Sequence, residues 1–527
     1  MRNILLAGIF ILGGFLRFYN IEKCCLHGDG VLTVGIISDS KNLMETWRNV
    51  TGGFRGDLPA YYIILDLWSY LVGDSVFCLR LFSLVCGLLF IAVVYKLAKL
   101  LFDRKTAILS AYLSAISPLL VFYSRKVRYY SLSSFLHLAS LYFFIRVIEK
   151  RDSGFGYWKP NHRPLAYRNC LFYVLLTSAG LYVNYSAFLF LLPQALFIIL
   201  YSHSYPSGLK RWLKCLALVF ILWLPLSGYF FRDFILLLQS EGFVRAPFKA
   251  GWLISALHLF FSFFFGETVS PFNYPVVAAG AAVCSIVLAK FLKERFFIRQ
   301  TDRQTDRNVV FLIITILTVT FLCALSGYNL SRYIKAVCGL CAITAALGIL
   351  SFCKKAVTLV LVMAITLLSA YSLHNLYAKN EYHHEEFVDS WDKISEFADS
   401  NSDVKDIIVF NGLAFGYYME KINPLKSIHS MPEDEEGMRQ LIREAIEGPK
   451  VERVVLVDSP LSGLRMNDFE DEIDLLKDYL SGHNYRLVKE ECFDRDRRAS
   501  LRRKFVDRPF PDCRTTVYVY EYFKPKM

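Results

Sequence analysis

Residues 76–99 read VFCLRLFSLVCGLLFIAVVYKLAK, an almost unbroken apolar run that is long enough to cross a bilayer as a helix. Comparable runs begin with an uncleaved first span at Met1–Leu16 and continue at 106–123, 130–147, 212–230, 274–292, 308–326, 334–351 and 356–373. Between 170 and 201 the apolar stretch is too long for one upright helix and is interrupted at Asn184-Tyr185, so we expect two short spans there. The sequence therefore predicts an α-helical polytopic membrane protein with about eleven transmembrane helices.

The composition points to the same class of protein. Hydrophobic residues make up 54% of the 527 residues and the mean hydropathy is +0.36, more apolar surface than a soluble fold buries. The net charge is +12, but Lys and Arg form short clusters between apolar runs instead of one stripe interleaved with aromatic residues. This pattern argues against a nucleic-acid partner. It is explained either by the enrichment of basic residues in cytoplasmic loops or by binding of lipid phosphates.

Two further apolar runs, Pro59–Val72 and Trp252–Phe265, are short for a full span and suit interfacial or re-entrant helices. If neither crosses, most basic clusters lie on one side, which is then the cytoplasm and holds the N-terminus. These clusters are Arg2, Arg104-Lys105, residues 150–168, Lys210 to Lys214, residues 293–307 and Lys354-Lys355. The outer side then holds a first outer loop at 21–75, the loops near 124–130, 231–273 and 327–332, and everything after 378.

Residues 379–527 differ in character from the transmembrane domain at 1–378, because they mix charges with helical and strand-like patterns. A helical pattern covers Glu386–Ala398, and strand-like runs cover Asp406–Phe410, Arg453–Val457 and Thr515–Tyr520. We expect a soluble extracytoplasmic α/β domain with no catalytic pattern of its own. Cys492 and Cys513 flank a basic stretch and are candidates for a disulfide if this end lies outside the cytoplasm.

Two of the carboxylates on the expected outer side are candidates for a functional role. Asp29, in the sequence His27-Gly28-Asp29-Gly30, follows the first span and could accept a proton from an acceptor hydroxyl as a general base. The same Gly-Asp-Gly sequence is also typical of a simple turn. Asp57 is the second outer carboxylate, and it also suits the start of a helix.

Basic residues on the outer side break the inside-positive pattern and are therefore candidates for binding a phosphate. Arg suits phosphate binding because its planar guanidinium can donate two hydrogen bonds to one phosphate. Two basic residues three positions apart lie on the same face of a helix and can contact the same phosphate. Anchoring of span ends at the interface is the alternative for each of them. The candidates are Arg125, Lys126 and Arg128 with neighbouring Tyr129, then Arg332 with Lys335, and Arg17 at the end of the first span.

These features occur in an order that resembles the dolichyl-phosphate-mannose protein mannosyltransferases and the bacterial aminoarabinose transferases, which are GT-C type (family 39-like) membrane glycosyltransferases. The resemblance covers roughly the first 380 residues. The matching stretches are Gly14 to Asn20 (GFLRFYN), Gly28-Asp29, Leu58 to Tyr62 (LPAYY) with Gly73 to Leu81, Ser117-Pro118 to Ser124, Arg128 to Leu132 (RYYSL) and Ser331-Arg332-Tyr333.

The resemblance implies that Asp29 is the catalytic base, since the family carries an Asp-Glu pair in its first outer loop. This chain has Gly30 in place of the Glu. The family's Ser-Gln-Glu-Ala-Arg loop reads Ser-Arg-Lys-Val-Arg here, so that Lys126 replaces an acid while Arg128 is kept. The family's His-Pro-Pro reads Asp57-Leu58-Pro59.

The sequence thus predicts an inverting sugar transfer from a polyprenyl-phosphate donor to a glycan, lipid or protein acceptor. Arg128 and Arg332 would stabilise the leaving phosphate, supported by the other outer cations. We expect no metal and no cofactor besides the lipid-linked sugar, because arginines can neutralise one phosphate. Two alternatives remain: a catalytically inactive relative that binds lipid-phosphate sugar or scaffolds a partner, and a transporter. A transporter would need polar or charged residues at mid-span and paired broken helices, and apart from the break at Asn184 we expect neither.

Overall fold

The computed structural model describes the backbone of residues 2–23, 26, 28–53, 57–149, 163–239, 252–294, 303–325, 334–378, 391–403, 406–410, 413–430, 437, 440–441, 451–458, 470–493 and 515–523. The chain forms two compact units. The first comprises 1–21 and 33–381, and the second comprises 22–32 and 382–527. The short segment 22–32 is thus grouped with the C-terminal residues.

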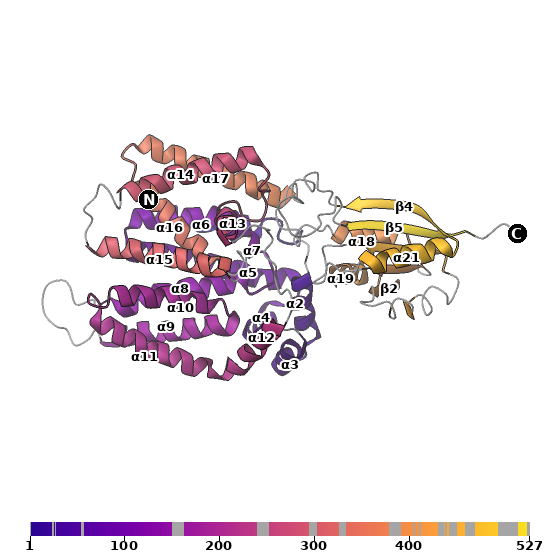
Figure 1. The fold of residues 1–527 in the computed structure, drawn as a ribbon, viewed down its shortest axis with the longest axis horizontal. Helices are drawn as coiled ribbons and strands as arrows, with labels where there is room; N and C mark the ends of the chain where they lie inside the picture. The colour runs from indigo at the N-terminus through magenta and orange to yellow at the C-terminus, as the bar shows by residue number, and fades with distance from the viewer. Residues whose placement is uncertain are drawn as a thin grey trace. The chain divides into compact units, whose positions relative to one another are not determined.

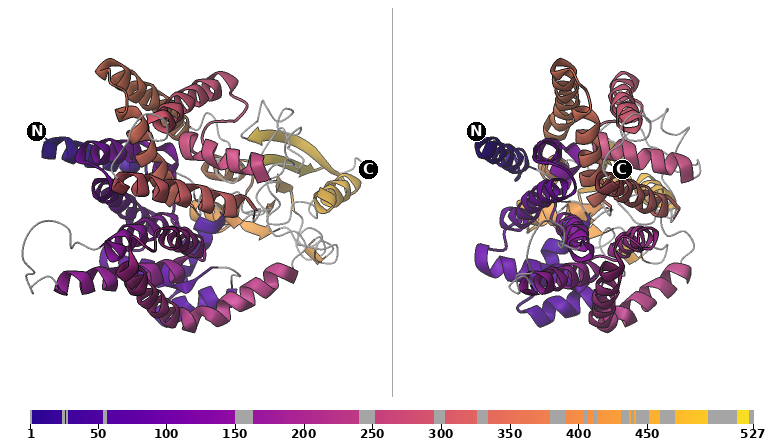
Figure 2. Two further views of the ribbon diagram at one scale, coloured as in Figure 1. Left: turned by 60° about the vertical axis from the view of Figure 1, so that its left-hand side comes forward. Right: turned by 90° about the vertical axis from the view of Figure 1, so that its left-hand side faces the viewer.

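The first unit is helical (Figure 1). Its elements are α1 (Arg2–Phe18), α2 (Gly28–Asp39, which begins in the second unit), α3 (Leu43–Gly53), α4 (Pro59–Val72), α5 (Val76–Leu101), α6 (Arg104–Ile116), α7 (Pro118–Tyr123), α8 (Tyr130–Ile148), α9 (Arg163–Val183), α10 (Ala187–Leu200), α11 (Pro206–Trp223), η2 (Leu224–Leu226), α12 (Ser227–Gln239), α13 (Trp252–Phe265), α14 (Tyr274–Leu292), α15 (Arg303–Leu325), α16 (Ala336–Leu350) and α17 (Lys355–Ala378). Helices α8, α9, α10, α11 and α15 lie side by side, and Figure 2 shows several helices of this unit end on.

Each run that was predicted to span contains a helix of this unit. Within the described part of the chain, six helices are long and apolar enough to cross a membrane, and α1, α10, α13 and α16 contain shorter apolar helices. The predicted interruption at Asn184 is present, since α9 ends at Val183 and α10 begins at Ala187. How many helices cross the bilayer stays a prediction.

The run at 106–123 differs from its prediction as one continuous helix. It divides into α6 and α7 at Ser117-Pro118, where Ser117 adopts an extended conformation with φ −60° and ψ 120°. Proline lacks the N–H of a helix interior and disfavours helical geometry in the residue before it. The carbonyls at the end of α6 are therefore available to other donors.

The expectation that the spans lack polar residues besides Asn184 is wrong. Inside α8–α11, Trp212 donates to Tyr173 at 2.9 Å, and Tyr173 donates to the fully buried Gln194 at 2.7 Å. His137 is also buried, near the middle of α8. Such side chains pair with one another because a lone polar group is costly in an apolar interior. Their presence removes one argument against a transporter.

The second unit is an α/β domain whose described strands form a five-stranded sheet in the order β2-β1-β3-β5-β4. Its elements are α18 (Trp391–Ser400), β1 (Ile407–Phe410), α19 (Leu413–Ile422), β2 (Ser427–Ser430), β3 (Arg453–Asp458), α21 (Glu470–Gly482), β4 (Tyr485–Phe493) and β5 (Thr515–Tyr522). β1 pairs in parallel with β2 and β3, whereas β5 is antiparallel to β3 and β4. One apolar cluster joins α21 to the sheet and another joins α18 and α19 to it.

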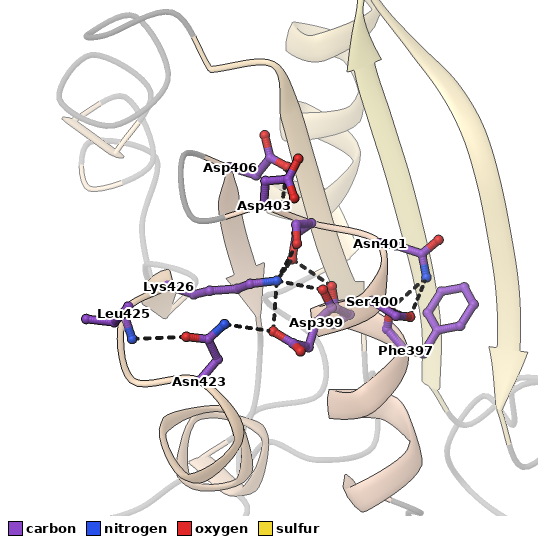
Figure 3. A network of polar contacts seen from close by, with 11 residues as sticks. Phe397, Asp399, Ser400, Asn401, Asp403, Asp406, Asn423, Leu425 and Lys426 are labelled. Atoms are coloured by element: carbon purple, nitrogen blue, oxygen red, sulfur yellow. Dashed lines mark hydrogen bonds and ion pairs between the residues drawn. The ribbon is translucent and has the colours of Figure 1, made fainter.

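Lys426 ties the end of α18 to the loop before β2 (Figure 3). Its ammonium donates to the backbone carbonyl of Asp399 at 2.6 Å, to the carbonyl of Ser402, and to the Ser402 hydroxyl at 2.8 Å. It also lies 2.8 Å from a carboxylate oxygen of Asp399, and this hydrogen bond lowers the pKa of Asp399. A cation at a helix C-terminus satisfies carbonyls that have no partner within the helix.

The predicted helix and three predicted strands correspond to α18, β1, β3 and β5, although residues 386–390 lie outside the described range. The sequence interpretation missed β2, β4, α19 and α21. Cys492 in β4 is disulfide-bonded, while Cys513 lies outside the described residues, so the Cys492–Cys513 pairing stays a prediction.

Candidate functional site

Arg128 lies in the turn between α7 and α8, where it meets side chains from α2 and from the start of α4. Its two terminal nitrogens donate to the two carboxylate oxygens of Asp57 at 2.9 and 3.1 Å, which is the bidentate geometry of a strong ion pair. One of these nitrogens also donates to the Tyr62 hydroxyl at 2.7 Å and to the Thr33 hydroxyl at 3.4 Å. Asp57 is thus a partner of Arg128.

Tyrosine side chains surround this ion pair. Tyr62 donates its own proton to Asp57 at 2.6 Å, so that Asp57 is bound by two residues. The guanidinium of Arg128 lies 5.0 Å from the ring centroid of Tyr129, at cation–π distance, and Tyr129 packs edge-on against Tyr61. Arg128 and Tyr129 are both more than nine-tenths buried. The guanidinium of Arg128 is therefore held in a mostly buried position among aromatic rings.

Lys335 lies at the start of α16 and is 1% exposed. Its ammonium is 4.3 Å from the ring centroid of Tyr123 and 4.7 Å from that of Tyr130. Tyr123 also donates to the carboxylate of Glu267 at 3.2 Å. Lys335 is thus held among aromatic rings, and Glu267 is a buried acid of the same neighbourhood.

Arg125 and Lys126, in the same turn as Arg128, also lie over aromatic rings. Arg125 donates to the backbone carbonyl of Asn20 at 2.6 Å and lies over the ring of Tyr377. The ammonium of Lys126 lies 4.7 Å from the ring centroid of Phe122. Both residues are buried. These contacts pack the turn against its surroundings, and a role of either residue in phosphate binding stays a prediction.

Arg17 is fully buried at the end of α1 and bonds mainly to backbone. Its guanidinium donates to the carbonyls of Gly13 at 2.9 Å, Ala115 at 3.0 Å and Ser114 at 3.4 Å, and to the Ser124 hydroxyl at 3.3 Å. Space for this arrangement depends on Gly87, because a Cβ there would stand 2.3 Å from the Ser124 oxygen. Arg17 thus satisfies the carbonyls that the break before Pro118 leaves free.

Asp29 is exposed and lies in the first turn of α2, within the second unit. Negative charge is favoured there because the first N–H groups of a helix have no partner within the helix. Gly30 is buried beside it, and a Cβ at Gly30 would stand 3.3 Å from the Leu26 side chain. The position of the family's Glu is thus tightly packed here. Arg332 lies outside the described residues.

The sequence interpretation did not single out Tyr62, Thr33 or Glu267. Tyr62 belongs to the LPAYY stretch and bonds to the nearby Asp57, but its contact with Arg128 joins residues that are 66 positions apart. Glu267 carried a visible signal, since it is an acid directly after the apolar run Trp252–Phe265 and Gly266. An ionisable residue inside or next to an apolar helix of a membrane protein is a candidate functional residue by default.

Known proteins resemble this chain in sequence profile and in fold. Residues 58–229 match the family of dolichyl-phosphate-mannose-protein mannosyltransferases. No curated protein sequence gives a match. The fold is similar to that of ArnT from Cupriavidus metallidurans in the apo state, with TM-score 0.58 and 11% identity over 98% of this chain and 97% of that chain.

Two structures with bound lipid phosphates share the fold. ArnT from Cupriavidus metallidurans bound to undecaprenyl phosphate matches with TM-score 0.54 and 11% identity, over 98% of this chain and 97% of that one. The archaeal oligosaccharyltransferase AglB from Archaeoglobus fulgidus, in complex with an inhibitory peptide and a dolichol-phosphate, matches with TM-score 0.50 and 12% identity, over 86% of this chain and 69% of that one.

The chain therefore has the fold of the GT-C class of membrane proteins, with a helical polytopic unit and a small C-terminal α/β unit. Within the helical unit, residues 58–229, which include Arg128, match the profile of the dolichyl-phosphate-mannose-protein mannosyltransferases. The resemblance and the fold class predicted from the sequence are confirmed.

Proposed function

We propose that this protein is an inverting membrane glycosyltransferase that takes a sugar from a polyprenyl-phosphate donor on the outer face of the membrane. The proposal rests on the geometry of Arg128, because its buried guanidinium donates two hydrogen bonds to the carboxylate of Asp57. A phosphate offers the same pair of oxygen acceptors, so it can take the place of a carboxylate on an arginine. Undecaprenyl phosphate and dolichol-phosphate are ligands in structures that share this fold.

In the proposed reaction Asp29 removes the proton of an acceptor hydroxyl or amine while the acceptor atom attacks C1 of the sugar. The C1–O bond to phosphate breaks with inversion, and its electron pair leaves with the polyprenyl phosphate. Arg128 and Arg332 stabilise the charge that develops on the phosphate, supported by Lys335, Arg125 and Lys126. The reaction so written needs no metal and no cofactor besides the lipid-linked sugar. The acceptor is a glycan, a lipid or a protein.

The proposed orientation has the N-terminus in the cytoplasm and the C-terminal unit outside. The disulfide at Cys492 supports this, because disulfides persist in oxidising compartments outside the cytoplasm. The basic clusters between the spans support it as well. In this orientation the C-terminal unit is available to select the acceptor.

The variant Asp29→Asn tests the proposal, because it keeps the size of the side chain but cannot act as the base. We expect sugar transfer to be abolished in membranes that are supplied with a polyprenyl-phosphate sugar, with expression unchanged. Asp39→Asn, at the other end of α2, is the matched control and should retain transfer. Full activity of Asp29→Asn would remove Asp29 from the mechanism. Absence of transfer by the unmodified protein with any such donor would favour an inactive relative.

A further inference from the structure

The segment 22–32, which carries Asp29, is anchored within the C-terminal unit. The backbone N–H of Leu26 donates to the hydroxyl oxygen of Tyr418 in α19 at 2.8 Å, across 392 positions of the chain. The side chain of Leu26 is 4% exposed. A buried backbone N–H must find a partner, and here the partner is a single tyrosine hydroxyl from a distant helix.

Apolar contacts hold the same segment on the other side of Asp29. Val31 packs against the cluster that α18 and α19 form with the sheet, which includes Trp391 and Phe415. Gly30 lies against Leu26, so the turn between the two anchors is tightly packed. Asp29 itself is exposed. An exposed carboxylate thus stands on a short piece of backbone that is fixed before it at Leu26 and after it at Val31.

We propose that Tyr418 is a positioning residue for the sugar-transfer reaction, because the C-terminal unit fixes through it the backbone that carries Asp29. This inference rests on the proposed role of Asp29 as the base. The efficiency of a general base depends on its distance from the proton that it removes. Loss of the Tyr418 hydroxyl frees the N–H of Leu26 and allows the Asp29 backbone to shift. The C-terminal unit then belongs to the catalytic apparatus as well as being a candidate for acceptor selection.

The variant Tyr418→Phe in the full-length protein tests this role, because it removes the hydroxyl and keeps the ring in its cluster. We expect kcat for sugar transfer to fall about tenfold with the KM for the polyprenyl-phosphate sugar unchanged, since misplacement of a catalytic group slows the chemical step. The amide hydrogen of Leu26 should exchange with solvent faster than in the unmodified protein. Tyr417→Phe is the matched control, because the neighbouring Tyr417 hydroxyl has no hydrogen-bond partner among the described residues.

Each outcome bears on one of the two proposals. Unchanged kcat in Tyr418→Phe, with an inactive Asp29→Asn, overturns the positioning role and leaves the proposed function standing. An equal fall of kcat in Tyr417→Phe also overturns it, because the effect would then be a general weakening of α19. Unchanged exchange at Leu26 overturns the anchoring on which the inference depends. Full activity in Asp29→Asn removes the proposed base, and the role of Tyr418 with it.

Discussion

Arg17 and Arg128 are two buried arginines of the same helical unit, and they differ in the kind of partner that they bind. Three of the hydrogen bonds of Arg17 go to backbone carbonyls of α1 and α6, which the helices hold in place. The described partners of Arg128 are the side chains of Asp57, Tyr62 and Thr33. A side-chain carboxylate can rotate away and let another anion bind, whereas a backbone carbonyl cannot. Burial alone therefore does not decide whether a cation only holds the fold together or is also available to bind a ligand.

Lys426 in the C-terminal unit behaves like Arg17. Its ammonium binds the carbonyls of Asp399 and Ser402, which keeps the end of α18 in place. In both units, the cations bound to backbone carbonyls stabilise a helix end. Because their partners differ, we expect different effects when Arg128, Arg17 and Lys426 are replaced.

The largest effect is expected for the double variant Arg128→Gln with Asp57→Asn. It removes both charges, so that no unpaired charge is left buried, and it keeps the approximate size of both side chains. We expect the protein to fold and sugar transfer to fall about 100- to 1000-fold, which is the usual loss when one group that stabilises developing charge is removed. Rates of transfer from a polyprenyl-phosphate sugar measure this.

The single variant Asp57→Asn is the matched control for that experiment, because it leaves the Arg128 charge in place. The unpaired charge should lower the stability of this variant, but each folded molecule should retain most of the transfer that the double variant loses. If the double variant transfers sugar at a rate within threefold of the unmodified protein, Arg128 does not contribute to the reaction and only stabilises the fold, as we expect for Arg17.

Arg17→Met should act on stability instead of activity. It leaves the carbonyls of Ser114 and Ala115 without their donor in a buried position, which should destabilise the folded protein by about 3 kcal/mol. Transfer per folded molecule should stay close to that of the unmodified protein. Thermal unfolding in detergent, together with the rate per folded molecule, measures both quantities.

Arg104→Met provides the comparison, because Arg104 is only half-buried and its hydrogen bond to Asn3 is exposed to solvent, so that its loss should change stability less than the loss of Arg17. A stable Arg17→Met protein that has lost transfer would contradict the assignment of Arg17 as a structural residue and would return it to the phosphate site.

The smallest effect concerns the pH dependence of the Lys426 network. The pKa of Asp399 is lowered in the folded protein, so this carboxylate contributes stability above the unfolded pKa of about 4, and the contribution is lost as the pH falls through the lower folded value. We expect the thermal unfolding temperatures of the unmodified protein and Lys426→Met to differ more at pH 7 than at pH 3. The change with pH should be below about 1 kcal/mol, because solvent reaches the Asp399 side chain.

Lys421→Met, on the same C-terminal unit, is a suitable control, because the ammonium of Lys421 lies over the Tyr417 ring. If the difference between the unmodified protein and Lys426→Met is the same at both pH values, the Asp399 charge does not contribute. Only the bonds from Lys426 to the carbonyls would then hold the end of α18.

Within the second unit, the sequence predicted the strands with the clearest patterns and missed the others for physical reasons. β1 and β3 are apolar and buried, so that composition alone reveals them. β4 is an edge strand that is exposed on both faces over most of its length, including Lys489, Glu490 and Glu491. It lacks the alternation of apolar and polar residues by which a half-buried strand is recognised. β2 is four residues long, with two serines and a histidine, and its existence depends on pairing with β1.

The sequence by itself determined the helical membrane unit, the break at Asn184 and the presence of cations near the ends of several helices. These are local properties, since the length of an apolar run and its interruptions are read from neighbouring residues. Only the tertiary structure decided what each cation binds. Arg17 meets the carbonyl of Ala115 across 98 positions, Arg128 meets Asp57 across 71, and Leu26 meets Tyr418 across 392. No local pattern encodes such partners, because they are fixed by how the helices pack after the chain has folded.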